Sequence, residues 1–279
     1  MAWVQQSDDL IAEAAARLVA KRSTAEGSEI PAPSTPGGEV WRREPDLDIW
    51  VIPQEERTIL ADLRTDGDAA TTWQAIRELV QGQGWPSEVH FDAFRGDGLA
   101  HGLAKASGAT RVATHMQVDV ATSAPAEGVA LQPMTPDDFA AYTEPEIEGY
   151  AQTLLQNGSA PTIETAREQS IAAHDALLPQ GLETPGQHLW NVVADGERVG
   201  MLWVALNEQR GFIYDIEMDA AHRGHGYGTQ TLRAGAAKTR DAGLATLALN
   251  VWGSNDDARR LYTREGYIET DAMWMADAG

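Results

Sequence analysis

The sequence predicts an α/β (α+β) fold that is built twice along the chain. Strand-like and helix-like runs alternate throughout the 279 residues, a length that favours about two domains with a core each. An internal repeat supports the duplication, because Asp92 and Asn250, Leu103 and Leu261, and Gly108 and Gly266 are all 158 positions apart. The third observation is a glycine-rich turn at residues 219–229, between a strand-like run and a helix-like run.

Apolar spacing near 3.6 predicts the helices of the first half, and β-rich runs predict its strands. We expect helices over residues 3–22, 70–81 and 98–107, strands over 40–41, 49–52, 58–63, 89–94 and 111–120, and a loop over 23–38. Residues 121–128 contain Ser123, Pro125 and Gly128 and are a predicted linker. The predicted domains are therefore residues 1–124 and 125–279.

The second half has clearer start and stop signals. We expect strands over residues 129–133, 189–194, 199–206, 211–218, 246–252 and 268–275, and helices from Pro136 and over 147–156, 163–177, 230–242 and 255–264. Asp195-Gly196 predicts a tight hairpin turn between two strands. Ser254 or Asn255 is the predicted cap of the last helix, and Gly266 ends it.

Composition excludes several classes of function. The formal charge of −21, from 42 acidic and 21 basic residues, argues against nucleic-acid or anionic-membrane binding. The negative charge suits a cationic substrate such as an amine. The alternative is that the acidic residues only keep the protein soluble. Cysteine is absent, and the seven histidines form no metal-spaced pair, so we expect no disulfide, thiol nucleophile or metal. Without a long apolar run or a basic leader, the expected location is cytoplasmic.

The glycine-rich turn has the chemistry of an anion site. Gly224, Gly226 and Gly228 let the backbone approach a phosphate, and the helix that follows presents unpaired N–H groups to it. Arg223 adds a cation at the entrance to the turn. The spacing differs from the dinucleotide-binding G-x-G-x-x-G, and no Gly-Lys-Ser/Thr occurs. A plain turn is the simpler alternative.

The repeat has lost this chemistry in its first copy. With one gap, Arg64 aligns with Arg223 and Gly67 with Gly226, so that Asp66 and Asp68 stand among the residues that replace the glycines. Carboxylates facing backbone amides would repel a phosphate. We expect the first half to bind no pyrophosphate.

The second half resembles the GNAT superfamily of N-acetyltransferases over about residues 129–275. The resemblance is carried by Arg223-Gly-His-Gly226-Tyr-Gly228, which matches the family's Arg/Gln-x-x-Gly-x-Gly/Ala loop. It is reinforced by Asn255-Asp-Asp-Ala258-Arg-Arg-Leu-Tyr262 followed by Gly266-Tyr267. The resemblance implies mixed, mostly antiparallel sheets flanked by helices, with a tandem GNAT-like layout whose first copy is degenerate.

The resemblance also implies a site for acetyl-CoA between two strands that splay apart, 212–218 and 246–252. The implied coenzyme A contacts are Ile216, Met218, Arg223, Gly224, His225, Gly226, Tyr227, Gly228, Thr229, Asn255 and Ala258. Tyr262 is the implied general acid. A backbone N–H near Met218 is the expected oxyanion donor, and Glu217 is our candidate base, on the opposite strand face from Phe212, Tyr214, Ile216 and Met218. Packing or ion pairing are the alternatives for Tyr262 and Glu217.

The acceptor residues are the least specified. Glu144, Glu146, Glu148 and Tyr150 are candidates for a cation pocket, and a solvated acidic helix face is the alternative. Asn250 stands where some members of the family have a glutamate, and it is a further candidate.

We expect an acetyl-CoA-dependent N-acetyltransferase that acts by direct attack of a primary amine in a ternary complex. Its partner would be a small-molecule or peptide amine, with no nucleic acid or membrane, and a homodimer is one expected assembly. The alternatives are a non-catalytic acyl-CoA sensor or subunit and, from the layout alone, a tandem acetyltransferase like mycothiol synthase.

Overall fold

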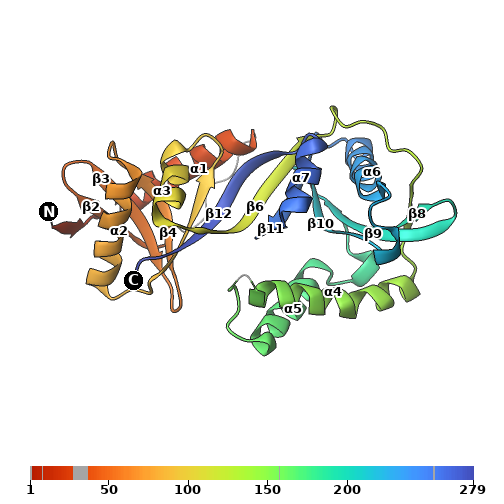
Figure 1. The fold of residues 1–279 in the computed structure, drawn as a ribbon, viewed down its shortest axis with the longest axis horizontal. Coiled ribbons are helices and arrows are strands. Elements are labelled where there is room, and N and C mark those ends of the chain that lie inside the picture. The colour runs from red at the N-terminus through yellow and green to blue at the C-terminus, as the bar shows by residue number, and fades with distance from the viewer. Residues whose placement is uncertain (1, 8, 28–36, 157, 254) are drawn as a thin grey trace. The chain divides into compact units, whose positions relative to one another are not determined.

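A computed structural model describes residues 2–7, 9–27, 37–156, 158–253 and 255–279 (Figure 1). The chain forms two compact units, which we call unit 1 (Met1–His115 and Glu269–Gly279) and unit 2 (Met116–Ile268). The predicted domain boundary after residue 124 stays a prediction. In the structure, the boundary between the units falls inside strand β6 (Thr110–Asp119), after His115, and the chain returns to unit 1 at Glu269.

Unit 1 is a mixed sheet with helices against it. Its strands are β1 (Trp3–Gln5), β2 (Glu39–Arg43), β3 (Leu47–Pro53), β4 (Thr58–Arg64), β5 (Glu88–Phe94), the first part of β6, and β12 (Ile268–Asp277); its helices are α1 (Asp9–Glu26), α2 (Ala69–Gln83) and α3 (Gly98–Ser107). The order β1-β2-β3-β4-β5-β12 is antiparallel except for the parallel pair β4 and β5.

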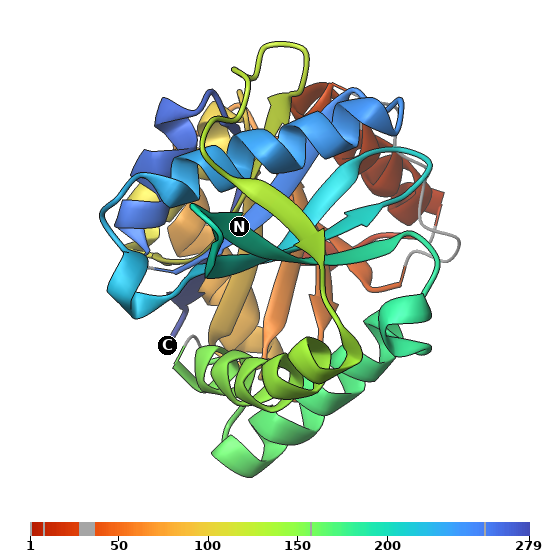
Figure 2. The same ribbon diagram turned by 90° about the vertical axis from the view of Figure 1, so that its right-hand side faces the viewer.

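Unit 2 has the same kind of sheet with helices on both faces. Its elements are the second part of β6, β7 (Ala130–Pro133), α4 (Pro136–Gln156), α5 (Ile163–Leu177), β8 (Gln187–Ala194), β9 (Glu197–Leu206), β10 (Gly211–Met218), α6 (Tyr227–Asp241), β11 (Thr246–Trp252) and α7 (Asp256–Arg264). Its strand order is β6-β11-β10-β9-β8-β7. Figure 2 shows α4 and α5 (green) on one side of these strands and α6 (blue) on the other.

The element positions confirm the internal repeat. Helices α2 and α6 begin at residues 69 and 227, β5 and β11 at 88 and 246, and β6 and β12 at 110 and 268, so each pair is 158 positions apart. The gapped alignment at the glycine turn is wrong by one residue. Asp68, rather than Gly67, is the counterpart of Gly226, because these two residues are the N-caps of α2 and α6.

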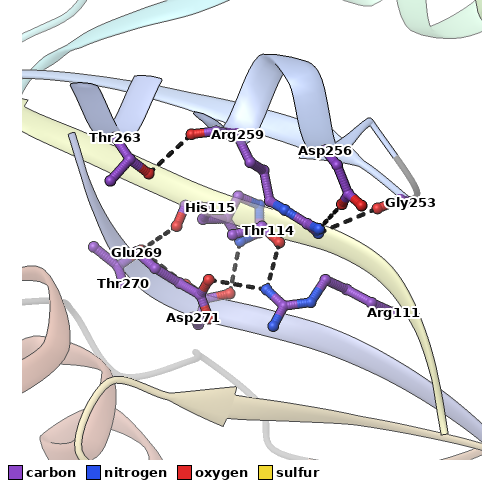
Figure 3. Close-up of polar contacts among 10 residues, drawn as sticks. All are labelled: Arg111, Thr114, His115, Gly253, Asp256, Arg259, Thr263, Glu269, Thr270 and Asp271. Carbon is purple, nitrogen blue, oxygen red and sulfur yellow. Dashed lines mark hydrogen bonds and ion pairs between the residues drawn. The ribbon is translucent and has the colours of Figure 1, made fainter. Parts of the chain in front are cut away.

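The two copies exchange their last strands. Strand β12 ends the second copy but pairs with β5 in unit 1, and its counterpart β6 reaches β11 in unit 2. Within unit 1, Arg111 of β6 binds Glu269 of β12 at 2.9 Å, and His115 binds Asp271 at 2.7 Å (Figure 3). Ala276 of β12 lies in the hydrophobic core of unit 1. Each unit is therefore completed by a strand from the other copy.

Several predicted elements differ from the observed ones. Trp3 belongs to strand β1, and the first helix begins only at Asp9 and continues to Glu26, into the predicted loop; residues 28–36 of that loop lie outside the described residues. One helix, α4, replaces the two predicted in residues 136–156 and contains Pro145 in its interior. Burial of Ala151 and Leu154 in a cluster with α5 favours the continuous helix despite the proline.

Turn and cap signals were more reliable. Asp195 and Gly196 join β8 and β9 with positive φ at both positions, 51° and 82°, which confirms the predicted hairpin. The Asn255 side chain caps α7 by accepting from the Ala258 N–H at 3.1 Å, whereas Ser254 lies outside the described residues. No helix in the described part of the chain is long and apolar enough to cross a membrane.

The gap between β4 and β5 in unit 1 is filled from α1. The two strands pair in parallel from Thr58 to Leu60, after which a cavity of only about 20 Å³ remains. The Asp62 side chain is fully buried there and forms ion pairs with Arg17 and Lys21, each at 2.8 Å. Lys21 also binds Asp97 at 3.2 Å. A buried carboxylate of this kind depends on its cations.

We predict that the double variant Arg17→Met, Lys21→Met lowers the stability of unit 1 by about 3–5 kcal/mol, because Asp62 is left buried without a counter-charge. Adding Asp62→Leu should recover most of the loss, since an apolar trio of similar size needs no charge compensation. Urea unfolding of the three proteins measures both effects. Equal stability of wild type and double variant would show that these pairs do not support the fold.

Candidate functional site

The site of unit 2 begins where two parallel strands separate. Strand β10 pairs with β11 only from Gly211 to Ile213, opposite Leu247 to Leu249, yet it stays paired with β9 as far as Met218. The splay that the resemblance implied is therefore present. Beyond Ile213 a gap opens between the strands, and a ligand there can use the backbone groups of β10 on that side.

A β-bulge at Tyr214 changes which side chains face which helices. Asp215 and Glu217 lie opposite Trp203 and Met201 of β9, on the face covered by α4 and α5, whereas Ile216 and Met218 pack with the core under α6. The prediction that Phe212 and Tyr214 share a face with Ile216 and Met218 is wrong. The Tyr214 ring lies 5.0 Å from that of Trp203 and 4.9 Å from that of Phe212, because the extra residue shifts the alternation.

The glycine turn forms the first wall of an open cleft. Gly224 and Gly226 have φ values of 80° and 84°, and no atom lies within 4 Å of the place where a Cβ would stand. Helix α6 begins at Tyr227, three residues earlier than predicted, so its first N–H groups open into the cleft. The cleft is about 780 Å³ and is lined by Ile216, Met218, His222, Arg223, Gly224, Gly226, Tyr227, Gly228, Thr229, Asn255, Asp257, Ala258, Arg260, Leu261, Tyr262 and Arg264.

The predicted coenzyme A contacts gather at this cleft with one exception. His225 lies outside its lining; its ring stacks on Tyr227, and its Nδ1 lies 3.1 Å from the Arg223 carbonyl. Arg223 itself donates to the Met218 carbonyl and to Glu217, both at 3.0 Å. The cleft fits a diphosphate, which needs close approach to backbone N–H groups and positive charge. The turn and the start of α6 supply free N–H groups, and the positive charge comes from Arg223, Arg260 and Arg264.

Helix α7 forms the opposite wall. Arg259 binds Asp256 and the Gly253 carbonyl, which ties the start of the helix to the turn after β11 (Figure 3). Asn255 combines the cap role with a place in the cleft lining. Tyr262 is 8% exposed, and burial raises its pKa to about 12. Its hydroxyl therefore keeps its proton at neutral pH and is available as a donor.

Two further cavities in the described part of the chain continue from this cleft. A chamber of about 620 Å³ shares Ile216, Asn255, Ala258 and Tyr262 with the cleft. A second pocket of about 490 Å³ adjoins the chamber, and the two share Glu146, Tyr150, Thr153, Tyr214, Asp215 and Trp252. The three spaces run from the glycine turn, through the strand gap, to the face under α4.

Two carboxyl groups between the chamber and the pocket are perturbed. Burial, with a contribution from Glu217, raises the pKa of Asp215 to about 6, although the Tyr142 hydroxyl donates to Asp215 at 3.0 Å. Burial and the charge of Asp215 raise the pKa of Glu146 to about 7. Strand alternation puts Asp215 on the same face as Glu217, but the burial that raises the pKa of Asp215 comes from tertiary packing and has no local signal in the sequence. A carboxyl with a pKa near neutrality in a cavity is suited to proton transfer.

The predicted acceptor residues separate into two groups. Tyr150 and Asn250 line the chamber, and the Tyr150 ring lies 6.2 Å from that of Trp252. Glu144 and Glu148 line none of these cavities and pair instead with Arg167 of α5. Glu217 lines the second pocket, but its side chain is 61% exposed and pairs with Arg223.

Unit 1 shows the same positions in a closed form. Asp62 follows the bulge residue of β4 as Asp215 follows that of β10. Two cations from α1 cover Asp62, whereas α4 covers Asp215 with the neutral Tyr142 and with Glu146. Asp68, in the place of Gly226, accepts the Ala70 and Thr71 N–H groups at 3.0 Å. The first copy thus uses its own carboxylate where the second has free N–H groups.

Comparison with known proteins agrees with this geometry. The acetyltransferase (GNAT) family model matches residues 148–267. The chain is 35% identical over 150 residues to the uncharacterized N-acetyltransferase YycN of Bacillus subtilis, covering 52% of this chain and 96% of that protein. It is 30% identical over 146 residues to the uncharacterized N-acetyltransferase YdgE of the same organism, covering 50% and 92%.

The fold likeness extends over both units. A crystal structure of a GCN5-related N-acetyltransferase from Sphaerobacter thermophilus matches with a TM-score of 0.57 and 18% identity, over 99% of this chain and 96% of that one. Identity at that level shows the fold alone. The splayed strands, the glycine turn at the start of α6, and relatives matched over nearly their whole length agree: the chain belongs to the GNAT family of acetyltransferases.

Proposed function

We propose that unit 2 transfers an acetyl group from acetyl-CoA to a primary amine by direct attack in a ternary complex. The observation that carries this proposal is the connected series of three cavities through the gap between β10 and β11. The series gives the donor and the acceptor separate entrances to the chamber, which is lined by Tyr262, Tyr214 and Asp215. Double displacement through an enzyme thiol has no nucleophile here, because the chain has no cysteine.

The donor would enter from the glycine turn. Its diphosphate would bind the N–H groups from Gly224 to Thr229, and its pantetheine amides would pair with β10 around Ile216 and Met218 like an added strand. Asn255 and Ala258 of α7 would close over the pantetheine. This arrangement directs the thioester toward Tyr262, where the cleft joins the chamber.

The chemistry requires two proton movements. The amine nitrogen forms a bond to the acyl carbon as the carbon–sulfur bond breaks, so the amine loses a proton and the sulfur gains one. We assign the first proton to Asp215, whose pKa of about 6 makes it a competent base at neutral pH. Tyr262 supplies the second, and a backbone N–H near Met218 stays our candidate oxyanion donor. Glu217 stays a candidate base, but its exposure and its bond to Arg223 favour Asp215.

The cofactor loop is tested by Gly226→Asp, which places a carboxylate where the diphosphate would bind. Acetyl-CoA at one hundred times its Kd should stabilise the wild type by about 2.7 kcal/mol, and this stabilisation should be lost in the variant. Thermal unfolding with and without the ligand measures it.

Gly243→Asp is the matched control. Gly243 follows the other end of α6, has a similar φ of 79°, and has no atom within 4 Å of its Cβ position. It should lower stability by a similar amount yet keep the ligand-induced shift. Equal shifts in both variants would remove the loop from the site.

The general acid is tested by Tyr262→Phe in an assay that reads the free thiol of coenzyme A against a panel of primary amines. We expect kcat to fall by about 10²–10⁴-fold, with little change in acetyl-CoA affinity, because the ring still fills its place in the core. Full activity in the variant would exclude this role. Binding of acetyl-CoA without turnover of any amine by the wild type would favour a non-catalytic acyl-CoA-binding subunit.

The base is tested by pH dependence. Asp215 acts only when deprotonated, so kcat/KM should fall with falling pH below about 6, the pKa of its carboxyl group in the free enzyme. Asp215→Asn should remove this acid limb together with most of the rate, and Glu217→Gln should keep both. If Glu217→Gln loses the limb and Asp215→Asn does not, Glu217 is the base.

A further inference from the structure

The chamber between α5 and the splayed strands collects polar atoms that have no partner. Within the described residues, seven buried side-chain nitrogen or oxygen atoms lack a hydrogen bond, and four of them belong to residues that line this chamber. They are Glu146 Oε2, Asn250 Oδ1 and both ring nitrogens of His174. Buried polar groups are usually paired, so a cluster of unpaired ones indicates a ligand that completes them.

His174 is the most enclosed of the three. Its side chain is only 8% exposed, and the nearest carboxylate oxygen, on Asp175, lies 3.6 Å from Nδ1, beyond hydrogen-bond distance. The ring stands between Phe139, at a centroid distance of 6.2 Å, and Trp203, at 6.4 Å. His174 therefore places two enclosed, unpaired ring nitrogens between aromatic rings in the α5 wall of the chamber.

The chemistry of these atoms specifies what they bind. A carboxylate oxygen and an amide oxygen accept hydrogen bonds, and a neutral imidazole has one accepting nitrogen. Asp215 adds a further carboxyl group to the same lining. Tyr150, Tyr214 and Trp252 offer aromatic faces that attract cations. A ligand with several N–H donors and positive charge satisfies this set.

The rest of the lining fits a hydrocarbon segment. Leu177, Phe212, Ile213, Leu249 and Val251 provide apolar surface beside the acceptors. A purely apolar occupant, such as a long acyl chain on the donor, would fill that surface but leave the four atoms unpaired. A short aliphatic segment with an amine at each end matches both parts of the lining.

We propose that the acceptor is a primary amine that carries a second protonated amine across an aliphatic spacer. This inference rests on the proposed acetyl transfer. The reacting amine lies at Asp215, where the chamber meets the second pocket, and the second amine lies among Glu146, Asn250 and His174 of the chamber lining. Linear diamines and polyamino sugars both supply this chemistry.

The test compares 1,5-diaminopentane with n-hexylamine, which has the same length but a methyl group in place of the second ammonium. With acetyl-CoA as donor, we expect kcat/KM to be at least about tenfold higher for the diamine, the equivalent of about 1.4 kcal/mol. Kanamycin represents the polyamino sugars. A kcat/KM for kanamycin above that for the diamine would indicate that the acceptor is a polyamino sugar. Equal or better use of n-hexylamine would overturn the proposal.

Variants locate the second amine. His174→Leu should bring the ratio of diamine to n-hexylamine close to one, and His174→Gln, which keeps an acceptor, should retain part of it. Glu168→Gln is the matched control: it removes a charge from an exposed position of the same helix and should leave the ratio unchanged. An unchanged ratio in folded His174→Leu and His174→Gln, verified by thermal unfolding, would contradict the assignment.

Equilibrium binding separates this inference from the function on which it rests. Titration of each amine into protein saturated with coenzyme A should show tighter binding of the diamine. If both amines are acetylated without preference, the second-amine site is wrong and acetyl transfer stands. If the diamine binds tightly but no amine is acetylated, the proposed transfer is wrong and the diamine site stands.

Discussion

The cavities of unit 2 depend on a β-ladder that stops early. Strands β10 and β11 pair only as far as Ile213 and Leu249, while β10 remains anchored to β9 along its whole length. A strand edge inside a protein needs partners for its N–H and C=O groups. The gap therefore suits a ligand with a peptide-like backbone, and the glycine turn at its end suits a diphosphate on the same ligand.

The duplication shows which features open this site and which close it. Both copies have the parallel pair of strands, the bulge and a carboxylate directly after the bulge. In unit 1 the cations of α1 neutralise Asp62 and fill the gap, and Asp68 satisfies the start of α2. In unit 2 the position of Asp62 is taken by Asp215, which lies beside Tyr142, and the position of Asp68 is taken by Gly226. One scaffold thus supports a closed packing element and an open cavity with a carboxyl group of raised pKa.

Local signals in the sequence predicted the parts of the site that local geometry controls. The glycine turn, the Asn255 cap and the Asp195-Gly196 hairpin follow from backbone requirements within a few residues. Asp215 was missed because its burial beside Tyr142 of α4, which distinguishes it from the exposed Glu217 on the same strand face, is set by tertiary packing. Residues four apart share a helix face, so Glu144 and Glu148 both meet Arg167, and Glu146 alone turns to the cavities. Which face meets the site is set by tertiary packing. The exchange of strands β6 and β12 could not be predicted either. The residue patterns of these segments predict strands, but they do not indicate with which copy each strand pairs.

The central claim is that one copy binds acetyl-CoA and the other is closed. The most direct test is the number of acetyl-CoA molecules bound per chain, measured by isothermal titration calorimetry at protein concentrations well above Kd. We expect one molecule per chain for the wild type and none for Gly226→Asp. Two molecules per chain, or one that survives Gly226→Asp, would contradict it.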